Sequence, residues 1–118
     1  MAHRIDPVAG SAAVDEWKRA AGTPIARPAL ATAVRFTLQQ LESRAPGGSV
    51  EVRVPPFGAV QCIAGTSHRR GTPPAVIETD AGTWLALATG SLAWAEAVGS
   101  GRVQASGERA DLTGYLPL

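Results

Sequence analysis

The hydrophobic pattern changes its period once near the middle of the chain, and this change limits the folds that the chain can adopt. Over residues 28–44, apolar side chains recur at helical spacing, with charged and amide side chains between them. Over residues 50–54, valines alternate with charged residues, which is the pattern of a strand with one face in water. The Ala-Pro-Gly-Gly segment at residues 45–48 separates the two patterns. The chain therefore predicts an α+β fold.

Another amphipathic helix is predicted before residue 28. Two starts are open for it, at residues 6–7 and at residues 10–11, because each pairs a capping residue with a residue suited to the first turn. Gly22 is a natural stop for this helix. We expect residues 1–27 to form an N-terminal helix and connector, and residues 28–118 to form the main domain, the two parts making one structural unit.

The remaining elements follow from alternation and turn residues. Five strands are predicted, at residues 50–54, 59–64, 75–79, 83–88 and 102–106. The Asp-Ala-Gly sequence at residues 80–82 suits a hairpin between the third and fourth strands. We expect a helix between Ser91 and Gly99 and one or two helical turns over residues 112–116. The sum is a five-stranded, mainly antiparallel sheet with helices covering one face.

Composition excludes several classes of protein. The 118 residues include 11 basic and 10 acidic ones, a net charge of +1, so the chain lacks the dense positive charge expected of a nucleic-acid binder. The single cysteine, Cys62, allows no internal disulfide and favours a reducing, cytoplasmic location. No apolar run approaches the roughly 18 residues of a membrane-spanning helix, and the N-terminus lacks the pattern of a secretory signal.

The sequence contains no catalytic or metal-binding constellation that we recognise. Cys62 falls in an apolar strand, where a lone thiol usually behaves as a small hydrophobic side chain. Two histidines and one cysteine do not have the spacing of a zinc site. We therefore expect a protein that is not an enzyme and needs no cofactor or metal. A small enzyme using Cys62 or His68 is the least favoured alternative.

Several segments together resemble a known family. Residues 83–97 and 101–107 look like the C-terminal half of the sterol carrier protein type-two family, in which a strand, a short helix and a strand ending in Ser-Gly follow one another. Residues 108–118 are similar to small actinobacterial members, and residues 50–61 look like the bacterial orthologues. The resemblance covers roughly residues 28–118.

The resemblance implies an apolar tunnel between the sheet and the helices, which holds a fatty acid, a fatty acyl-CoA, a sterol or another lipid. The residues that we expect to line it are Trp84, Leu85, Leu87, Trp94, Val103, Leu112, Tyr115 and Leu116. In the loop over residues 65–74, His68, Arg69 and Arg70 are candidates to hold an anionic head group. The alternative for this loop is a solvated surface segment.

The function expected from these observations is soluble binding and transport of a lipid-like ligand, without stable membrane insertion. The alternative is a non-catalytic partner domain that acts in trans with another protein or enzyme, since similar domains are appended to bacterial enzymes. A homodimer through the N-terminal helix is a further arrangement that the sequence leaves open.

Overall fold

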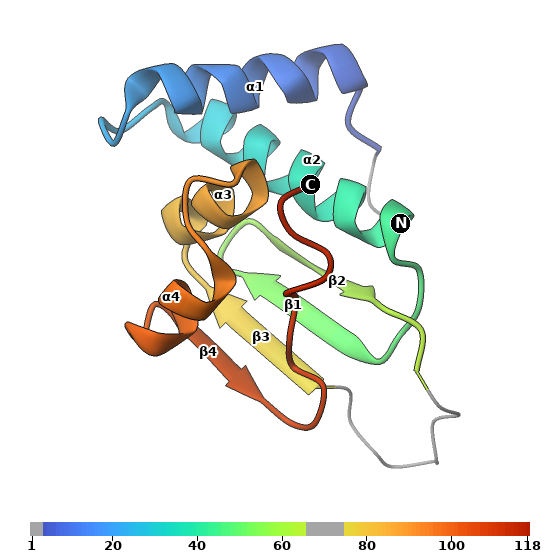
Figure 1. Cartoon of the computed structure of the whole chain (residues 1–118). Coiled ribbons are helices and arrows are strands. Elements are labelled where there is room, and N and C mark those ends of the chain that lie inside the picture. The colour runs from blue at the N-terminus through green and yellow to red at the C-terminus, as the bar shows by residue number, and fades with distance from the viewer. Residues whose placement is uncertain (1–3, 66–74) are drawn as a thin grey trace.

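A computed structural model of the chain describes residues 4–65 and 75–118. In chain order, its elements are α1 (Pro7–Ala20), α2 (Arg27–Arg44), β1 (Val50–Val54), β2 (Gly58–Cys62), β3 (Ala75–Thr79), α3 (Ala81–Thr89), α4 (Trp94–Gly99) and β4 (Val103–Ser106). The strands form one sheet in the order β2-β1-β3-β4 (Figure 1). The predicted α+β fold is confirmed.

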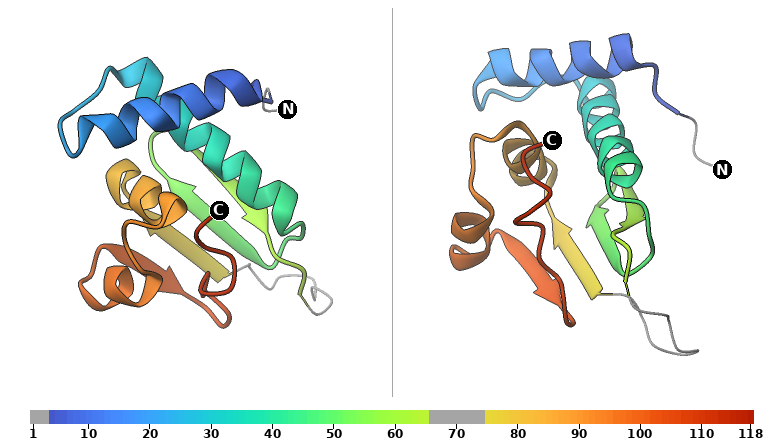
Figure 2. Two further views of the ribbon diagram at one scale, coloured as in Figure 1. Left: turned by 45° about the horizontal axis from the view of Figure 1, so that its top comes forward. Right: turned by 45° about the vertical axis from the view of Figure 1, so that its right-hand side comes forward.

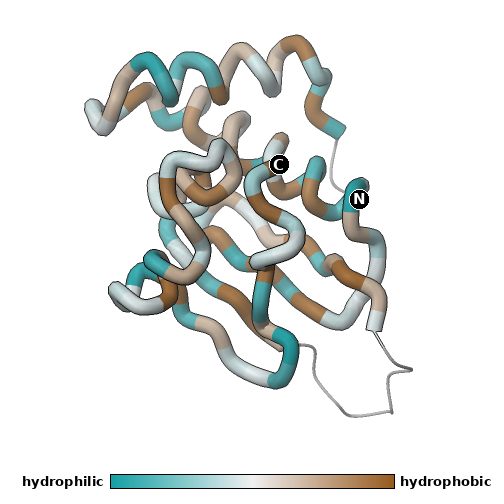
Figure 3. Tube along the Cα trace, viewed as in Figure 1, coloured by the Kyte–Doolittle hydropathy of each residue, from teal (hydrophilic) through white to brown (hydrophobic). Residues whose placement is uncertain are grey.

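The sheet has one apolar face and one polar face. β1 pairs antiparallel with β2 and parallel with β3, and β3 pairs antiparallel with β4. Val50, Val52 and Val54 are fully buried on one face, whereas Arg53 on the other face is exposed. Figure 3 shows the resulting alternation of hydrophobic and hydrophilic positions along the strands. Alternation of this kind arises when helices cover only one side of a sheet.

The long helix α2 supplies much of that cover. Its apolar stripe places Val34, Leu38 and Leu41 in the core, at most 2% exposed. Figure 2 shows α2 lying along β1 and β2. α3 and α4 cover the rest of the same sheet face, and the C-terminal segment runs between α2 and these two helices. Residues 107–118 therefore complete the cover of the sheet.

The strand predicted at residues 83–88 is wrong, because these residues belong to α3. Asp80 caps this helix: its Oδ2 accepts a hydrogen bond of 3.0 Å from the backbone N–H of Thr83. Gly90 ends the helix in the left-handed conformation, at φ 87°. The helix is buried on most sides, so its sequence shows no clear helical period. The described residues consequently form four of the five expected strands, and β4 is the one predicted at residues 102–106.

Two helix boundaries near the C-terminus also differ from the prediction. Ser91 does not cap a helix; α4 begins at Trp94, and the Ser91 hydroxyl donates to the carbonyl of Ala86 instead. Residues 112–116 form a turn without a helix. The Asp111 carboxylate accepts a 2.8 Å bond from the N–H of Thr113, a local turn that competes with helix formation.

The N-terminal helix α1 crosses α2 on the side away from the sheet (Figure 2). It starts at the earlier of the two predicted sites, where Asp6 caps the helix and Pro7 occupies its first turn. Only Gly10 and Ala13 of α1 are buried. A β-carbon on Gly10 would come within 2.2 Å of Cγ of Phe36, so the glycine allows the two helices to approach closely. None of the helices in the described ranges has the length and hydrophobicity needed to cross a bilayer.

Candidate functional site

Five of the eight side chains predicted to line a tunnel lie deep in the layer between the sheet and its helices. Trp84, Leu85 and Leu87 of α3 are at most 1% exposed, Leu112 is fully buried, and Val103 is 5% exposed. They belong to one hydrophobic core, so in this conformation they pack against other side chains of the chain. Their contact with a ligand stays a prediction.

The other three predicted side chains lie nearer the surface. Trp94 and Leu116 are partly buried and pack against the core. Tyr115 is 41% exposed.

A hydrogen-bonded pair that the sequence did not indicate fixes the centre of this layer. The indole Nε1 of Trp84 donates a 2.8 Å hydrogen bond to Oγ1 of Thr37, which in turn donates to the carbonyl of Ala33 at 2.8 Å. Thr37 lies on α2 and is 3% exposed. Because a buried indole N–H without a partner is costly, this bond sets the position of α3 against α2.

The C-terminal segment is attached to α3 by its last residues. The backbone N–H of Leu118 donates a 3.0 Å bond to the carbonyl of Ala88. Pro117 lies against Gly90: a β-carbon added to Gly90 would come within 3.3 Å of Cβ of Pro117. Leu112, in the middle of the segment, is fully buried. The segment is thus held in place by the buried side chain of Leu112 and by the backbone of Leu118.

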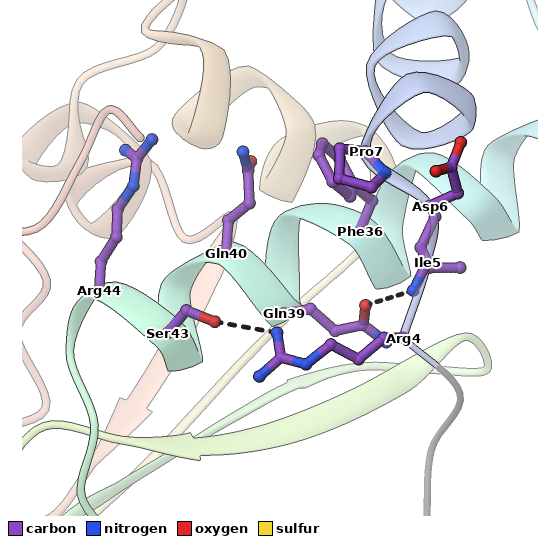
Figure 4. Close-up of a pocket in the computed structure, with 9 residues that line it drawn as sticks. All are labelled: Arg4, Ile5, Asp6, Pro7, Phe36, Gln39, Gln40, Ser43 and Arg44. Atoms are coloured by element: carbon purple, nitrogen blue, oxygen red, sulfur yellow. Dashed lines mark hydrogen bonds between the residues drawn. The ribbon is translucent and has the colours of Figure 1, made fainter.

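A cavity of about 430 Å³ lies outside this layer, between the N-terminal segment and α2 (Figure 4). It is lined by Arg4, Ile5, Asp6, Pro7, Phe36, Gln39, Gln40, Ser43 and Arg44. Two hydrogen bonds hold its walls together. The N–H of Ile5 donates to Oε1 of Gln39 at 2.9 Å, and Nη1 of Arg4 donates to Oγ of Ser43 at 3.2 Å.

The cavity combines an apolar wall with two arginines. Ile5, Pro7 and the ring of Phe36 supply the apolar part, and Figure 4 shows Gln40 and Arg44 projecting from one side of α2 beside them. The one ion pair among the described residues joins Arg53 to Glu51, far along the chain. Neither Arg4 nor Arg44 therefore has a carboxylate partner there.

The sequence alone did not indicate this cavity. Its residues come from the segment before α1 and from the C-terminal half of α2, and they meet only because α1 crosses α2 at Gly10. Arg44 also has a structural reason to be where it is, since a cation in the last turn of a helix is favoured by the helix dipole. No local motif in the sequence marks these residues as a group.

Two smaller hollows lie elsewhere on the described residues. One, of about 240 Å³, adjoins the first: it shares Phe36 and Gln40 with it and extends to Lys18 and Leu118. The other, of about 290 Å³, is bordered by Glu78, Asp80, Arg102 and other polar residues at one end of the sheet. None of the tunnel residues that we predicted lines any of the three hollows.

The three predicted head-group residues, His68, Arg69 and Arg70, lie outside the described residues. The chain on either side of them is held by Ser49. The N–H and hydroxyl of Ser49 both donate to the carbonyl of Ile63, at 3.0 and 2.6 Å, and its own carbonyl accepts from the N–H of Ala75 at 3.0 Å. One residue thus connects both ends of the segment that contains the predicted head-group loop.

Cys62 lies at the end of β2 and is fully buried. Burial, with a smaller contribution from the nearby negative charge of Glu42, raises the pKa of its thiol to about 11. The thiol is therefore protonated at neutral pH, and a protonated thiol is a poor nucleophile. Among residues 4–65 and 75–118, no cluster of three histidine, cysteine or carboxylate side chains could hold a metal ion.

The fold defines a class: a small α+β domain whose sheet exposes one face and covers the other with helices and a C-terminal segment. Comparison with protein families identifies it further. The model of the family described as bacterial SCP ortholog, that is, bacterial orthologues of sterol carrier protein, matches residues 26–118. The chain belongs to this family, which confirms the resemblance seen in the sequence and supports a general lipid-binding role. No curated protein matches the chain.

Proposed function

We propose that this chain is a carrier of a lipid-like molecule, a fatty acid, a fatty acyl-CoA or a sterol-like compound, which it binds between the sheet and its helices. The observation that carries the proposal is the extent of the family match. Residues 26–118 comprise α2, the whole sheet, α3, α4 and the C-terminal segment, which are the parts that enclose the apolar layer. The match omits most of the N-terminal segment and α1, which lie outside that layer.

The chemistry of the layer suits such a ligand. Its predicted lining consists of aliphatic and aromatic side chains, and burial of each ligand methylene there contributes about 0.8 kcal/mol. In the conformation described, side chains occupy this space, so binding requires α3, α4 or the C-terminal segment to move away from the sheet. The C-terminal segment is the part best suited to move, because residues 107–118 have little regular structure of their own.

We further propose that the chain acts without catalysis and in a reducing, cytoplasmic environment. The buried thiol of Cys62, with its pKa of about 11, supports this proposal, because it removes the best nucleophile in the sequence from the surface.

The test is native mass spectrometry of the freshly purified protein, followed by titration of the delipidated protein with a fluorescent fatty acid. Energy transfer from the three tryptophans reports binding. Saturable binding that Trp94→Ala weakens and that Trp17→Ala leaves unchanged would support the proposal, since Trp94 borders the layer and Trp17 lies on α1. A clean apo mass together with the absence of saturable binding would reject it.

A further inference from the structure

We propose that the cavity between the N-terminal segment and α2 is a separate binding site for a single-chain amphiphile that carries a carboxylate. This inference goes beyond the proposed function. The layer between sheet and helices is built from residues within the family match at 26–118, whereas Arg4, Ile5, Asp6 and Pro7 of the cavity lie before it. The site would thus need the N-terminal segment as well as α2 of the family domain.

The size and lining of the cavity select the apolar part of the ligand. Its volume of about 430 Å³ is within the range of roughly 300–1,000 Å³ found for small-molecule sites. Ile5, Pro7 and Phe36 supply the apolar part of its lining (Figure 4). A short alkyl chain placed against these side chains would lose contact with water, which is the source of hydrophobic binding energy.

The charges of the cavity select the polar end of the ligand. Arg4 and Arg44 have no carboxylate partner among the described residues, and Gln40 adds an amide beside Arg44. The one carboxylate in the lining, Asp6, caps α1 by accepting a 3.1 Å hydrogen bond from the N–H of Ala9. The lining therefore has an excess of one positive charge, with guanidinium groups available to a carboxylate.

The crossing of the two helices gives the cavity a defined shape. Gly10 rests against the ring of Phe36, and Ile5 is bonded to Gln39, so contacts on α2 hold both α1 and the segment before it. A ligand would bind between walls that are already in place, at a small cost in conformational entropy. The apolar wall and the arginines would then act on the two ends of one molecule.

The experiment is a titration of the full chain, labelled with ¹⁵N, with octanoate and, in parallel, with octanol. We expect octanoate to shift the amide resonances of Ile5, Gln40 and Arg44 in a saturable way. Octanol has a similar chain without the charge, and we expect it to bind about tenfold more weakly, the usual effect of losing a charged hydrogen bond.

Two variants assign the effect to the arginines. Arg44→Gln removes a guanidinium for which no hydrogen bond to another described residue is found, and we expect it to weaken octanoate binding about tenfold. Thermal unfolding should shift only slightly, through the lost interaction of this charge with the dipole of α2. Arg4→Gln should weaken octanoate binding similarly. This variant also loses the hydrogen bond from Arg4 to Ser43, and thermal unfolding measures the effect of that loss on stability. Arg19→Gln is the matched control, because Arg19 lies on α1 and does not line the cavity.

Three results would overturn the inference: no saturable shift at these amides, equal affinity for octanol and octanoate, or unchanged octanoate binding in Arg44→Gln. Shifts confined to Trp84, Leu87 and Leu112 would also overturn it, but would support binding in the layer beneath the helices. Failure of this site and failure of the proposed function are therefore distinguishable in one spectrum.

Discussion

The indole of Trp84 on α3 and the hydroxyl of Thr37 on α2 form a 2.8 Å hydrogen bond in the centre of the core, between residues 47 positions apart. Thr37 is itself tied to its own helix through the carbonyls of Ala33 and Val34. Two helices that cover the same sheet face are thus joined by a buried polar contact with specific geometry, in addition to apolar packing.

Removing the hydroxyl tests the importance of this contact. We expect Thr37→Val to lower the free energy of unfolding by about 1–3 kcal/mol, because it leaves the buried indole N–H without a partner. Equilibrium unfolding in urea measures the change. Thr32→Val on the same helix is the control, since the two substitutions have the same effect on helix propensity and Thr32 is less buried. Equal losses in the two variants would show that the hydrogen bond contributes nothing specific.

The contact between Gly10 and Phe36 predicts a reversal of the usual effect of glycine replacement. Within a helix, Gly→Ala normally stabilises by roughly 0.5–1 kcal/mol. A β-carbon at Gly10 would come within 2.2 Å of Cγ and 2.3 Å of Cδ1 of Phe36, so we expect Gly10→Ala to destabilise the packing of α1 on α2. Hydrogen exchange of the α1 amides should become faster.

Gly99→Ala provides the control for this prediction. Gly99 ends α4, and a β-carbon there would meet nothing within 4 Å. We expect this variant to be as stable as the wild type or slightly more stable. If Gly10→Ala instead behaved like Gly99→Ala, the close approach of the two helices would be disproved, and the cavity beside it would lose its wall.

Asp80 predicts a pH dependence in the acid range. Burial alone would raise the pKa of this carboxyl group, but hydrogen bonds from the hydroxyl and N–H of Thr83 outweigh it, and the net pKa is lowered. The ionised carboxylate therefore stabilises the folded state above the unfolded pKa of about 3.9, and this stabilisation disappears as the pH falls through the lower folded pKa.

The comparison of wild type with Asp80→Asn isolates this charge, because asparagine keeps the capping geometry. We expect the wild type to be more stable by about 0.3–1 kcal/mol at pH 7, a modest value because the side chain is largely in solvent. The difference should disappear in strong acid. Urea unfolding at several pH values measures it, and a difference that stayed constant with pH would exclude a role for the charge.

The sequence predicted an element correctly where its apolar and polar residues recur with one clear period. β1 was predicted because Val50, Val52 and Val54 alternate with charges, and α2 was predicted because its stripe separates Leu38 from Arg35 and Gln39. α3 was not, because Trp84, Leu85, Leu87 and neighbouring residues are all buried, and a short segment buried on most sides has no polar face to show its period. Asp80 followed by Thr83 was the available signal, a helix cap that we interpreted as part of a hairpin.

The residues of the interior layer could be named from the sequence, whereas those of the cavity could not. The tunnel residues were chosen by resemblance and are clustered along the C-terminal third of the chain, so five of them share one core. The cavity instead requires Arg4 and Arg44, 40 positions apart in the numbering, to line one hollow beside a helix crossing. Tertiary geometry of this kind has no local signature, and only the structure places these residues together.

The thiol of Cys62 provides a last prediction, at alkaline pH. Its pKa is about 11 in the folded chain, raised mainly by burial, from an ordinary value of 9.0. Between these values the unfolded chain releases the thiol proton and the folded chain retains it, so stability falls as the pH rises. From about pH 8 to about pH 10.5, this group alone should cost about 2 kcal/mol.

Cys62→Ala separates this effect from the other groups that titrate in the same range. The variant should be less stable than the wild type near neutral pH, because it loses buried sulfur contacts. The difference should shrink, or change sign, as the pH rises, since alanine has no proton to release. In a parallel measurement, a thiol reagent should modify native Cys62 at pH 8 far more slowly than the unfolded chain. Rapid modification of the native protein would contradict the burial of Cys62 and, with it, the argument that this thiol is unsuited to catalysis.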